Sequence, residues 1–183
     1  MSHEMVDSAW AYARRNYCGY SALNHEESHS TITIVGVGNR FCGDDAVGPV
    51  IVEQLTQEAP VGVRIFEIGD DQTELIELMR ATDAMIIVDA VQASAPAGTI
   101  FRLDMSQGPA PQNFFFSSTH GLDVIHTVEL ARTMGMLPRY VFIYGVAGKS
   151  FSRSSRLSAE VREVTDIVVA RILNEIDMIF ALL

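Results

Sequence analysis

The sequence predicts an α/β domain of three layers, in which helices cover both faces of a twisted, mostly parallel five-stranded sheet with one antiparallel edge strand. Short apolar or β-branched runs alternate along the chain with segments whose apolar residues recur at helical spacing. The run at residues 84–88 is apolar throughout, which is typical of a strand covered on both faces. These two observations together predict a sheet enclosed between helices.

Each element follows from its own local pattern. The expected strands are residues 31–35, 63–68, 84–88, 99–103 and 140–146. The expected helices are residues 46–55, 72–80, 120–134 and a last long helix that begins near residue 158. The connection at 91–98 is too short for a crossover helix, so strand 99–103 should run antiparallel to its predecessor and lie towards a sheet edge.

Composition defines the class of protein. A chain of 183 residues with 48% hydrophobic and 20% charged residues fits one compact domain, residues 31–183, preceded by an appendage at 1–30 that is either flexible or a short helix. A net charge of −10 argues against nucleic acid and anionic membranes as partners. No apolar run is long enough for membrane insertion. Two cysteines, Cys18 and Cys42, form no C-x-x-C pair, which fits a reducing cytoplasm. The oligomeric state stays open.

A glycine-rich loop with two adjacent acids, Asp44 and Asp45, follows the first expected strand. It does not fit the dinucleotide pattern G-x-G-x-x-G, because the third glycine position holds Phe41, whose bulk would block close packing of helix on strand. Near the end of the chain Gly148, Lys149 and Ser150 imitate the tail of a phosphate loop, but Ile143 stands where that loop needs its first glycine. Paired acids would repel a phosphate, so they favour a cation.

Three potential metal ligands share one edge of the expected sheet. Asp45 follows the first strand, Asp89 ends the third, and His120 opens a helix at the same edge, where open α/β sheets bind ligands. Each has an ordinary structural role open to it, as a helix cap, a loop-binding acid or a surface histidine. Together, two carboxylates and an imidazole suit nickel, zinc or another divalent ion.

Other nucleophiles and metal ligands fit less well. Cys42 lies beside the glycine loop and is expected to pack as a small apolar residue. Serine and threonine residues at 117–119 precede His120, whereas His126 lies on another side of the same expected helix and is expected to be solvent-facing or packed. The polar stretch at 24–29 holds two histidines and two glutamates and is expected to be a linker rather than a metal site.

Four segments carry a resemblance to a known family. They are residues 36–48 (GVGNRFCGDDAVG), 86–90 (IIVDA), 118–123 (STHGLD) and 143–146 (IYGV). In this order they resemble the hydrogenase maturation endopeptidases, and the resemblance spans roughly residues 31–170. Members of that family remove a C-terminal extension from the large-subunit precursor of a nickel–iron hydrogenase after nickel insertion.

The resemblance implies a function and a site. It places the metal-contacting and catalytic residues at Asp45, Asp89 and His120, and it gives Asn39 and Asp44 roles in fixing the loop. Nickel carried by the precursor would be the recognition element, and cadmium or zinc would be able to occupy the same site. Two routes stay open: nickel as a tag that positions the scissile bond, or a metal-polarised water as nucleophile.

Two alternatives to this function also stay open. The first is a non-enzymatic α/β module that binds a metal or a nucleotide in the same crevice. The second is a related peptidase that processes another metalloprotein.

Overall fold

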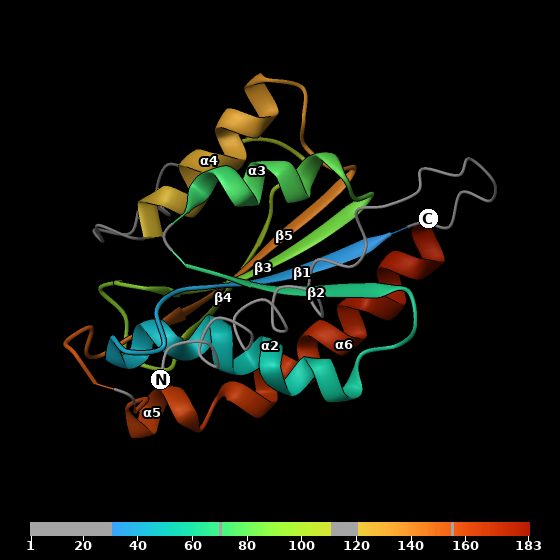
Figure 1. The fold of residues 1–183 in the computed structure, drawn as a ribbon. Helices are drawn as coiled ribbons and strands as arrows, with labels where there is room; N and C mark the ends of the chain where they lie inside the picture. The colour runs from blue at the N-terminus through green and yellow to red at the C-terminus, as the bar shows by residue number, and fades with distance from the viewer. Residues whose placement is uncertain (1–30, 70, 111–120, 155) are drawn as a thin grey trace, which may run out of the picture.

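The computed structural model describes residues 31–69, 71–110, 121–154 and 156–183. Its centre is a five-stranded sheet in the order β2-β1-β3-β5-β4. Helices α3 and α4 cover one face of this sheet, and α2, α5 and α6 cover the other (Figure 1). The three-layer architecture expected from the sequence is therefore confirmed. The expected appendage at 1–30 lies outside the described residues.

The strands agree closely with the sequence patterns. They are β1 (Ile32–Val37), β2 (Val63–Ile68), β3 (Ala84–Val91), β4 (Ile100–Asp104) and β5 (Tyr140–Ala147). β1 pairs in parallel with β2 and β3, and β3 pairs in parallel with β5. β4 pairs antiparallel with β5 at the edge of the sheet, as the short connection before it predicts.

The described helices are α2 (Val47–Glu58), α3 (Gln72–Arg80), α4 (Gly121–Thr133), α5 (Ala159–Arg162) and α6 (Thr165–Leu182), with a 3₁₀ turn η1 (Gly43–Ala46) before α2. They differ from expectation at two places, which are this turn and the last helix. The last expected helix is thus divided into α5 and α6, because the chain tightens where the N–H of Val164 bonds to the carbonyl of Val161, three residues back. Among the described helices, none is both long and apolar enough to cross a bilayer.

Side chains alternate between the two faces of the sheet and form two cores. Ile86 and Val88 of β3 pack with α2 and α6, whereas Met85 and Ile87 pack with α3 and α4. Both faces of the central strands are therefore buried, which explains why their sequences show no polar positions facing solvent.

The start of α2 lies unusually close to the sheet. A Cβ on Gly48 would lie 2.3 Å from the carbonyl oxygen of Val37 and 2.6 Å from that of Val88. The facing residue on β1 is Gly36, where a Cβ would lie 2.5 Å from the oxygen of Gly48. Because only hydrogen atoms separate these backbones, the two glycines set the distance between α2 and the ends of β1 and β3.

A buried ionic network ties α6 to the sheet. Glu175 of α6 is 2% exposed and accepts hydrogen bonds from Arg102 Nε (2.5 Å) and Nη2 (2.9 Å) of β4 and from Tyr144 Oη (2.8 Å) of β5. Burial and the bond to Glu175 raise the pKa of Tyr144, so the phenol stays protonated and donates. The carboxylate is thereby paired and hydrogen-bonded, as a buried charge requires.

We predict that Gly48→Ala destabilises the fold by about 2–4 kcal/mol, because its Cβ would overlap backbone atoms that have no room to move. The midpoint of urea unfolding, followed by circular dichroism, measures this change. Gly69→Ala is the matched control, since a Cβ there meets nothing within 4 Å, and its effect should stay within about 0.5 kcal/mol. Equal midpoints for the two variants would contradict the proposed close approach.

Candidate active site

The residues between β1 and α2, 38–46, form a loop at the carboxyl end of β1, which we call the site loop. It begins at Gly38, where φ is 133° and a Cβ would lie 2.0 Å from the carbonyl oxygen of Asp45. The side-chain oxygen of Asn39 accepts a hydrogen bond from the N–H of Phe41 (2.9 Å) and so closes the next turn. Asn39 therefore has the loop-fixing role that the resemblance gives it.

Asp45 lies in η1, inside the site loop. It is 4% exposed, and its Oδ2 accepts a hydrogen bond from the N–H of Asn39 (2.8 Å). This bond holds the carboxylate against the turn that leaves β1. Asp45 is therefore fixed near the carboxyl end of β1 rather than at the first turn of α2, which begins two residues later at Val47.

Asp89 lies in the neighbouring strand, β3, and is 3% exposed. In the register of β1 and β3, Gly36 pairs with Val88, so Asp89 lies beside the end of β1 and the start of the site loop. It does not end β3, as the sequence indicated, because the strand continues to Val91 through its pairing with β5. The next two strands in the sequence, β2 and β3, lie on opposite sides of β1 in the sheet. The carboxyl ends of β1 and β3 therefore form the switch point where open α/β sheets bind ligands. Buried carboxylates are normally paired, hydrogen-bonded or bound to metal.

The third expected ligand, His120, lies outside the described residues, as do the serines and threonine at 117–119. Helix α4 begins at the next residue, Gly121. Within the part of the chain that the structure describes, no group of three metal-binding side chains occurs. His126 of α4 is exposed, which agrees with the solvent-facing alternative for this residue.

The other acid of the pair, Asp44, is fully buried and binds backbone rather than facing the site. Its Oδ2 accepts hydrogen bonds from the N–H groups of Lys149 (2.7 Å) and Ser150 (3.0 Å), and its Oδ1 accepts one from the N–H of Ser158 (2.6 Å). Burial alone would raise the pKa of Asp44, but these three bonds outweigh it and lower the pKa below its usual value of 3.8. Asp44 thus joins the site loop to the segment between β5 and α5.

These bonds also explain why the glycine–lysine–serine sequence at 148–150 is not a phosphate loop. The N–H groups of Lys149 and Ser150, which would face a phosphate in such a loop, donate instead to Asp44. The ammonium group of Lys149 binds Glu160 (2.6 Å). An anion of the protein itself therefore occupies the position of the phosphate.

Arg40, which the sequence patterns did not single out, anchors the outer side of the site loop. Its guanidinium contacts Glu67 of β2 at 2.6 Å and Glu53 of α2 at 2.7 Å, and it donates to the carbonyl of Pro49 (3.2 Å). The hydrogen bonds that Arg40 donates to the carboxylate of Glu67 are the main cause that raises the pKa of Arg40. The two glutamates are distant in sequence, so no local pattern could have indicated this contact.

Phe41 does not block the contact of helix and strand, as the sequence suggested, because it is 69% exposed. That contact is made instead by Gly36 and Gly48. The dinucleotide pattern is still excluded, but for a different reason: α2 begins too late for it, at Val47. Cys42 is partly buried, and its backbone pairs with Ser154.

Comparison with known proteins gives one consistent result. A family model described as hydrogenase maturation protease matches residues 49–175, a range that includes Asp89 and position 120 and begins after Asp45. The chain is 30% identical to the hydrogenase 2 maturation protease of Escherichia coli K12 over 147 residues, which cover 78% of this chain and 88% of that protein. It is 26% identical over 121 residues to the hydrogenase expression/formation protein HupD of Thiocapsa roseopersicina, covering 65% of this chain and 55% of HupD.

The fold agrees with these sequence matches. The solved structure of the hydrogenase maturating endopeptidase HybD from Escherichia coli superimposes on this chain with a TM-score of 0.71 at 28% identity. The superposition covers 81% of this chain and 93% of HybD. The five-stranded sheet and its helices are therefore those of a hydrogenase-maturating endopeptidase.

We predict that Asp44→Asn lowers the free energy of unfolding by about 2–4 kcal/mol at pH 7, because three buried N–H groups lose a charged acceptor. The folded-state pKa of Asp44 is lowered, so the stabilisation is fully present above about pH 4. It is lost as the pH falls through that lowered pKa.

The difference in unfolding free energy between wild type and Asp44→Asn should therefore shrink below pH 4. Urea unfolding at a series of pH values measures it. Asp177→Asn, at an exposed position of α6, is the control and should change little at any pH. A gap that stays constant down to pH 2 would show that the charge of Asp44 is not what stabilises the site loop.

Proposed function

Because the chain belongs to the hydrogenase maturation protease family, we propose that it is an endopeptidase that removes the C-terminal extension of a nickel–iron hydrogenase large-subunit precursor. In this proposal the precursor carries nickel, which the enzyme recognises. The observation that supports it most is the placement of Asp45 and Asp89, two buried carboxylates at the switch point of the sheet, one just after β1 and the other two residues before the end of β3. The proposed place of action is the cytoplasm.

In the proposed site Asp45, Asp89 and His120 contact the nickel of the precursor. Carboxylates and an imidazole form a donor set that suits this ion. Asp45 comes from the site loop and Asp89 from β3, so an ion held between them would lie at one end of the sheet. The precursor's own nickel ligands would complete the coordination, which makes a nickel-free precursor a poor substrate.

Hydrolysis of the scissile peptide bond adds a hydroxyl group to the carbonyl carbon and a proton to the leaving amine. Nickel supports this step in either of two ways. It positions the bond, or it also acidifies the attacking water. In both cases the three side chains hold the ion, and the site loop fixes the direction of the Asp45 carboxylate through its bond to Asn39.

We predict that purified enzyme shortens a nickel-loaded large-subunit precursor and leaves the nickel-free precursor intact. The intact mass of the precursor, followed over time, measures the cleavage. Asp45→Asn, Asp89→Asn and His120→Ala should each slow cleavage by about 100-fold or more, because each removes a nickel contact. Asn at position 45 keeps an oxygen that can accept the bond from Asn39.

His126→Ala is the matched control for His120→Ala, since residue 126 is exposed on α4, and it should cleave at the wild-type rate. Circular dichroism would verify that every variant is folded. Absence of shortening by the wild-type enzyme would refute the peptidase. Nickel binding without any shortening would favour the non-enzymatic binding module instead.

We also predict that cadmium or zinc binds the free enzyme at the proposed site. Isothermal titration calorimetry should show one site whose affinity falls about 10- to 100-fold in Asp89→Asn and in Asp45→Asn, while His126→Ala leaves it unchanged. An affinity that neither Asp45→Asn nor Asp89→Asn lowers would place the ion elsewhere and remove the metal role from these two residues.

A further inference from the structure

Two arginines next to the site loop have no partner for their charge. Arg153 and Arg156 belong to the segment between β5 and α5, and both are exposed. Within the described part of the chain, neither guanidinium group forms a hydrogen bond or an ion pair. The preceding cation in the sequence, Lys149, is bound to Glu160. The positive charges of Arg153 and Arg156 are therefore available to a partner.

The charge around these arginines is opposite to that of the whole protein. The chain has a net charge of −10, yet residues 130–159 contain no Asp or Glu. The same stretch carries five of the 13 Lys and Arg residues, which are Arg132, Arg139, Lys149, Arg153 and Arg156. An acidic partner is therefore attracted to Arg153 and Arg156 and repelled by much of the remaining surface.

The backbone beside both arginines is bound to the site loop through Ser154. The N–H of Ser154 donates to the carbonyl of Phe41 (2.9 Å), and its carbonyl accepts a hydrogen bond from the N–H of Gly43 (2.8 Å). The hydroxyl of Ser154 accepts a hydrogen bond from the N–H of Arg156 (3.2 Å). Arg153 and Arg156 therefore extend from a backbone that is held against the site loop.

The same contact places an exposed aromatic residue beside Arg153. Cys42 and Ser154 form a parallel bridge, in which Phe41 and Arg153 each come one residue earlier. The backbones of Phe41 and Arg153 are therefore about 4.8 Å apart, the spacing of neighbouring strands. Phe41 is 69% exposed, although both its N–H and its carbonyl are hydrogen-bonded. We call Phe41, Arg153 and Arg156 the loop surface.

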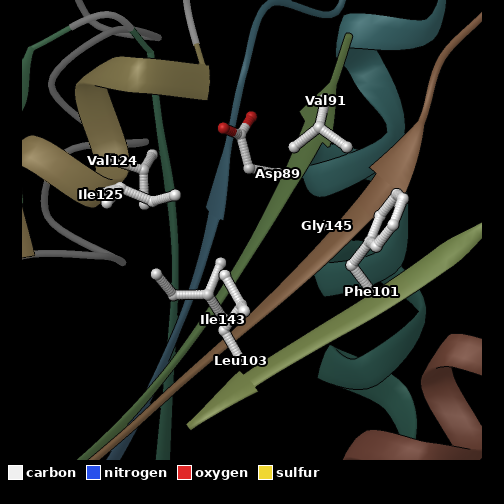
Figure 2. A pocket seen from close by; sticks show the side chains of 8 residues that line it. All are labelled: Asp89, Val91, Phe101, Leu103, Val124, Ile125, Ile143 and Gly145. Carbon is white, nitrogen blue, oxygen red and sulfur yellow. The ribbon is translucent and has the colours of Figure 1, made fainter. Parts of the chain in front are cut away.

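The loop surface lies close to the proposed nickel contact. The N–H of Asp45 donates to the carbonyl of Cys42 (3.3 Å), so one turn of chain separates Asp45 from the bridge to Ser154. The Cα atoms of Asp45 and Arg153 are therefore at most about 15 Å apart. β5, which leads into the segment of Arg153, lies next to β3, which carries Asp89 (Figure 2). An extended peptide covers such a distance in about five residues.

We propose that the loop surface docks the precursor: Arg153 and Arg156 bind an acidic side chain of the precursor, and Phe41 packs against an apolar one. Both side chains belong to residues within about five positions of the scissile bond. This inference rests on the proposed peptidase function. Arginine pairs with a carboxylate through two parallel hydrogen bonds, and an exposed ring gains from apolar contact. Nucleic acid fits less well, because two cations do not offset the repulsion from a net charge of −10.

The first test measures cleavage of the nickel-loaded precursor as a function of its concentration. The double variant Arg153→Glu/Arg156→Glu should raise KM about 10-fold or more and change kcat by less than about 2-fold, because it alters docking and not the nickel contacts. Phe41→Ala should raise KM about 5-fold.

The matched control is the double variant Arg139→Glu/Arg171→Glu. It makes the same change of net charge at two exposed arginines, one just before β5 and the other in α6, both away from the site loop. Its KM should stay within about 2-fold of the wild-type value. Thermal unfolding would verify that each variant is folded.

Exchange of charge identifies the acidic partner. In the precursor, each Asp or Glu near the cut is replaced in turn by Lys. One replacement should raise KM about 10-fold with the wild-type enzyme and restore a lower KM with Arg153→Glu/Arg156→Glu. If no replacement is reversed in this way, the pairing with an acidic side chain is wrong.

Measurement of binding separates this inference from the proposed function. The dissociation constant of the nickel-loaded precursor is measured by biolayer interferometry on His120→Ala enzyme, with and without Arg153→Glu/Arg156→Glu. If the wild type cuts the precursor but neither KM nor this constant depends on the arginines, the docking inference is wrong and the peptidase stands. If the precursor is not cut, the peptidase is wrong, and weaker binding by the arginine variant would still support docking.

Two further outcomes would overturn the docking inference. The first is equal or undetectable binding of an uncut precursor by both enzymes. The second concerns a single-stranded oligothymidylate as a competing probe. If it binds more tightly than the precursor and loses this affinity in Arg153→Glu/Arg156→Glu, the surface binds nucleic acid instead.

Discussion

The edge of the sheet that carries the proposed site depends on one buried carboxylate, that of Asp44. It accepts hydrogen bonds from Lys149, Ser150 and Ser158, more than 100 residues further along the chain. The backbone of the site loop binds the same segment between β5 and α5, since the N–H of Gly43 donates to the carbonyl of Ser154. Asp45 is the next residue, so its direction depends on a contact that Asp44 makes. The adjacent acids thus divide two tasks: one holds the loop and the other is presented at the strand end.

The fold, and the places of two proposed site residues in it, followed from local sequence patterns. Strand β2 and helix α3 begin and end at the expected residues, and the antiparallel edge strand follows from the short connection before it. The burial of Asp45 and Asp89 near the carboxyl ends of β1 and β3 agrees with the sequence patterns, although β3 continues two residues past Asp89, and their role as metal ligands stays a prediction. The break between α5 and α6 did not follow, because apolar spacing continues across it while the hydrogen bonding changes only at Val164.

Long-range contacts set the limit of what the sequence could predict. Arg40 binds glutamates from α2 and β2, and its role exists only once these elements are packed together. The same holds for Arg153, which appears in sequence as one cation of a serine-rich stretch. Only the bridge between the site loop and the segment after β5 places it beside Phe41. His120 lies outside the described residues and remains a prediction from its position and from the family resemblance.

The packing of α6 has a consequence for the order in which the protein folds. Ile172, Ile176 and Ile179 complete the core on the face of the sheet that begins with Ile32 and Ile34, at the opposite end of the described chain. This layer therefore closes only after α6 has left the ribosome. Until then α2 covers only part of this apolar face, and parallel pairing between distant segments is slow. A nascent chain of this protein therefore exposes apolar surface on this face until α6 packs against it.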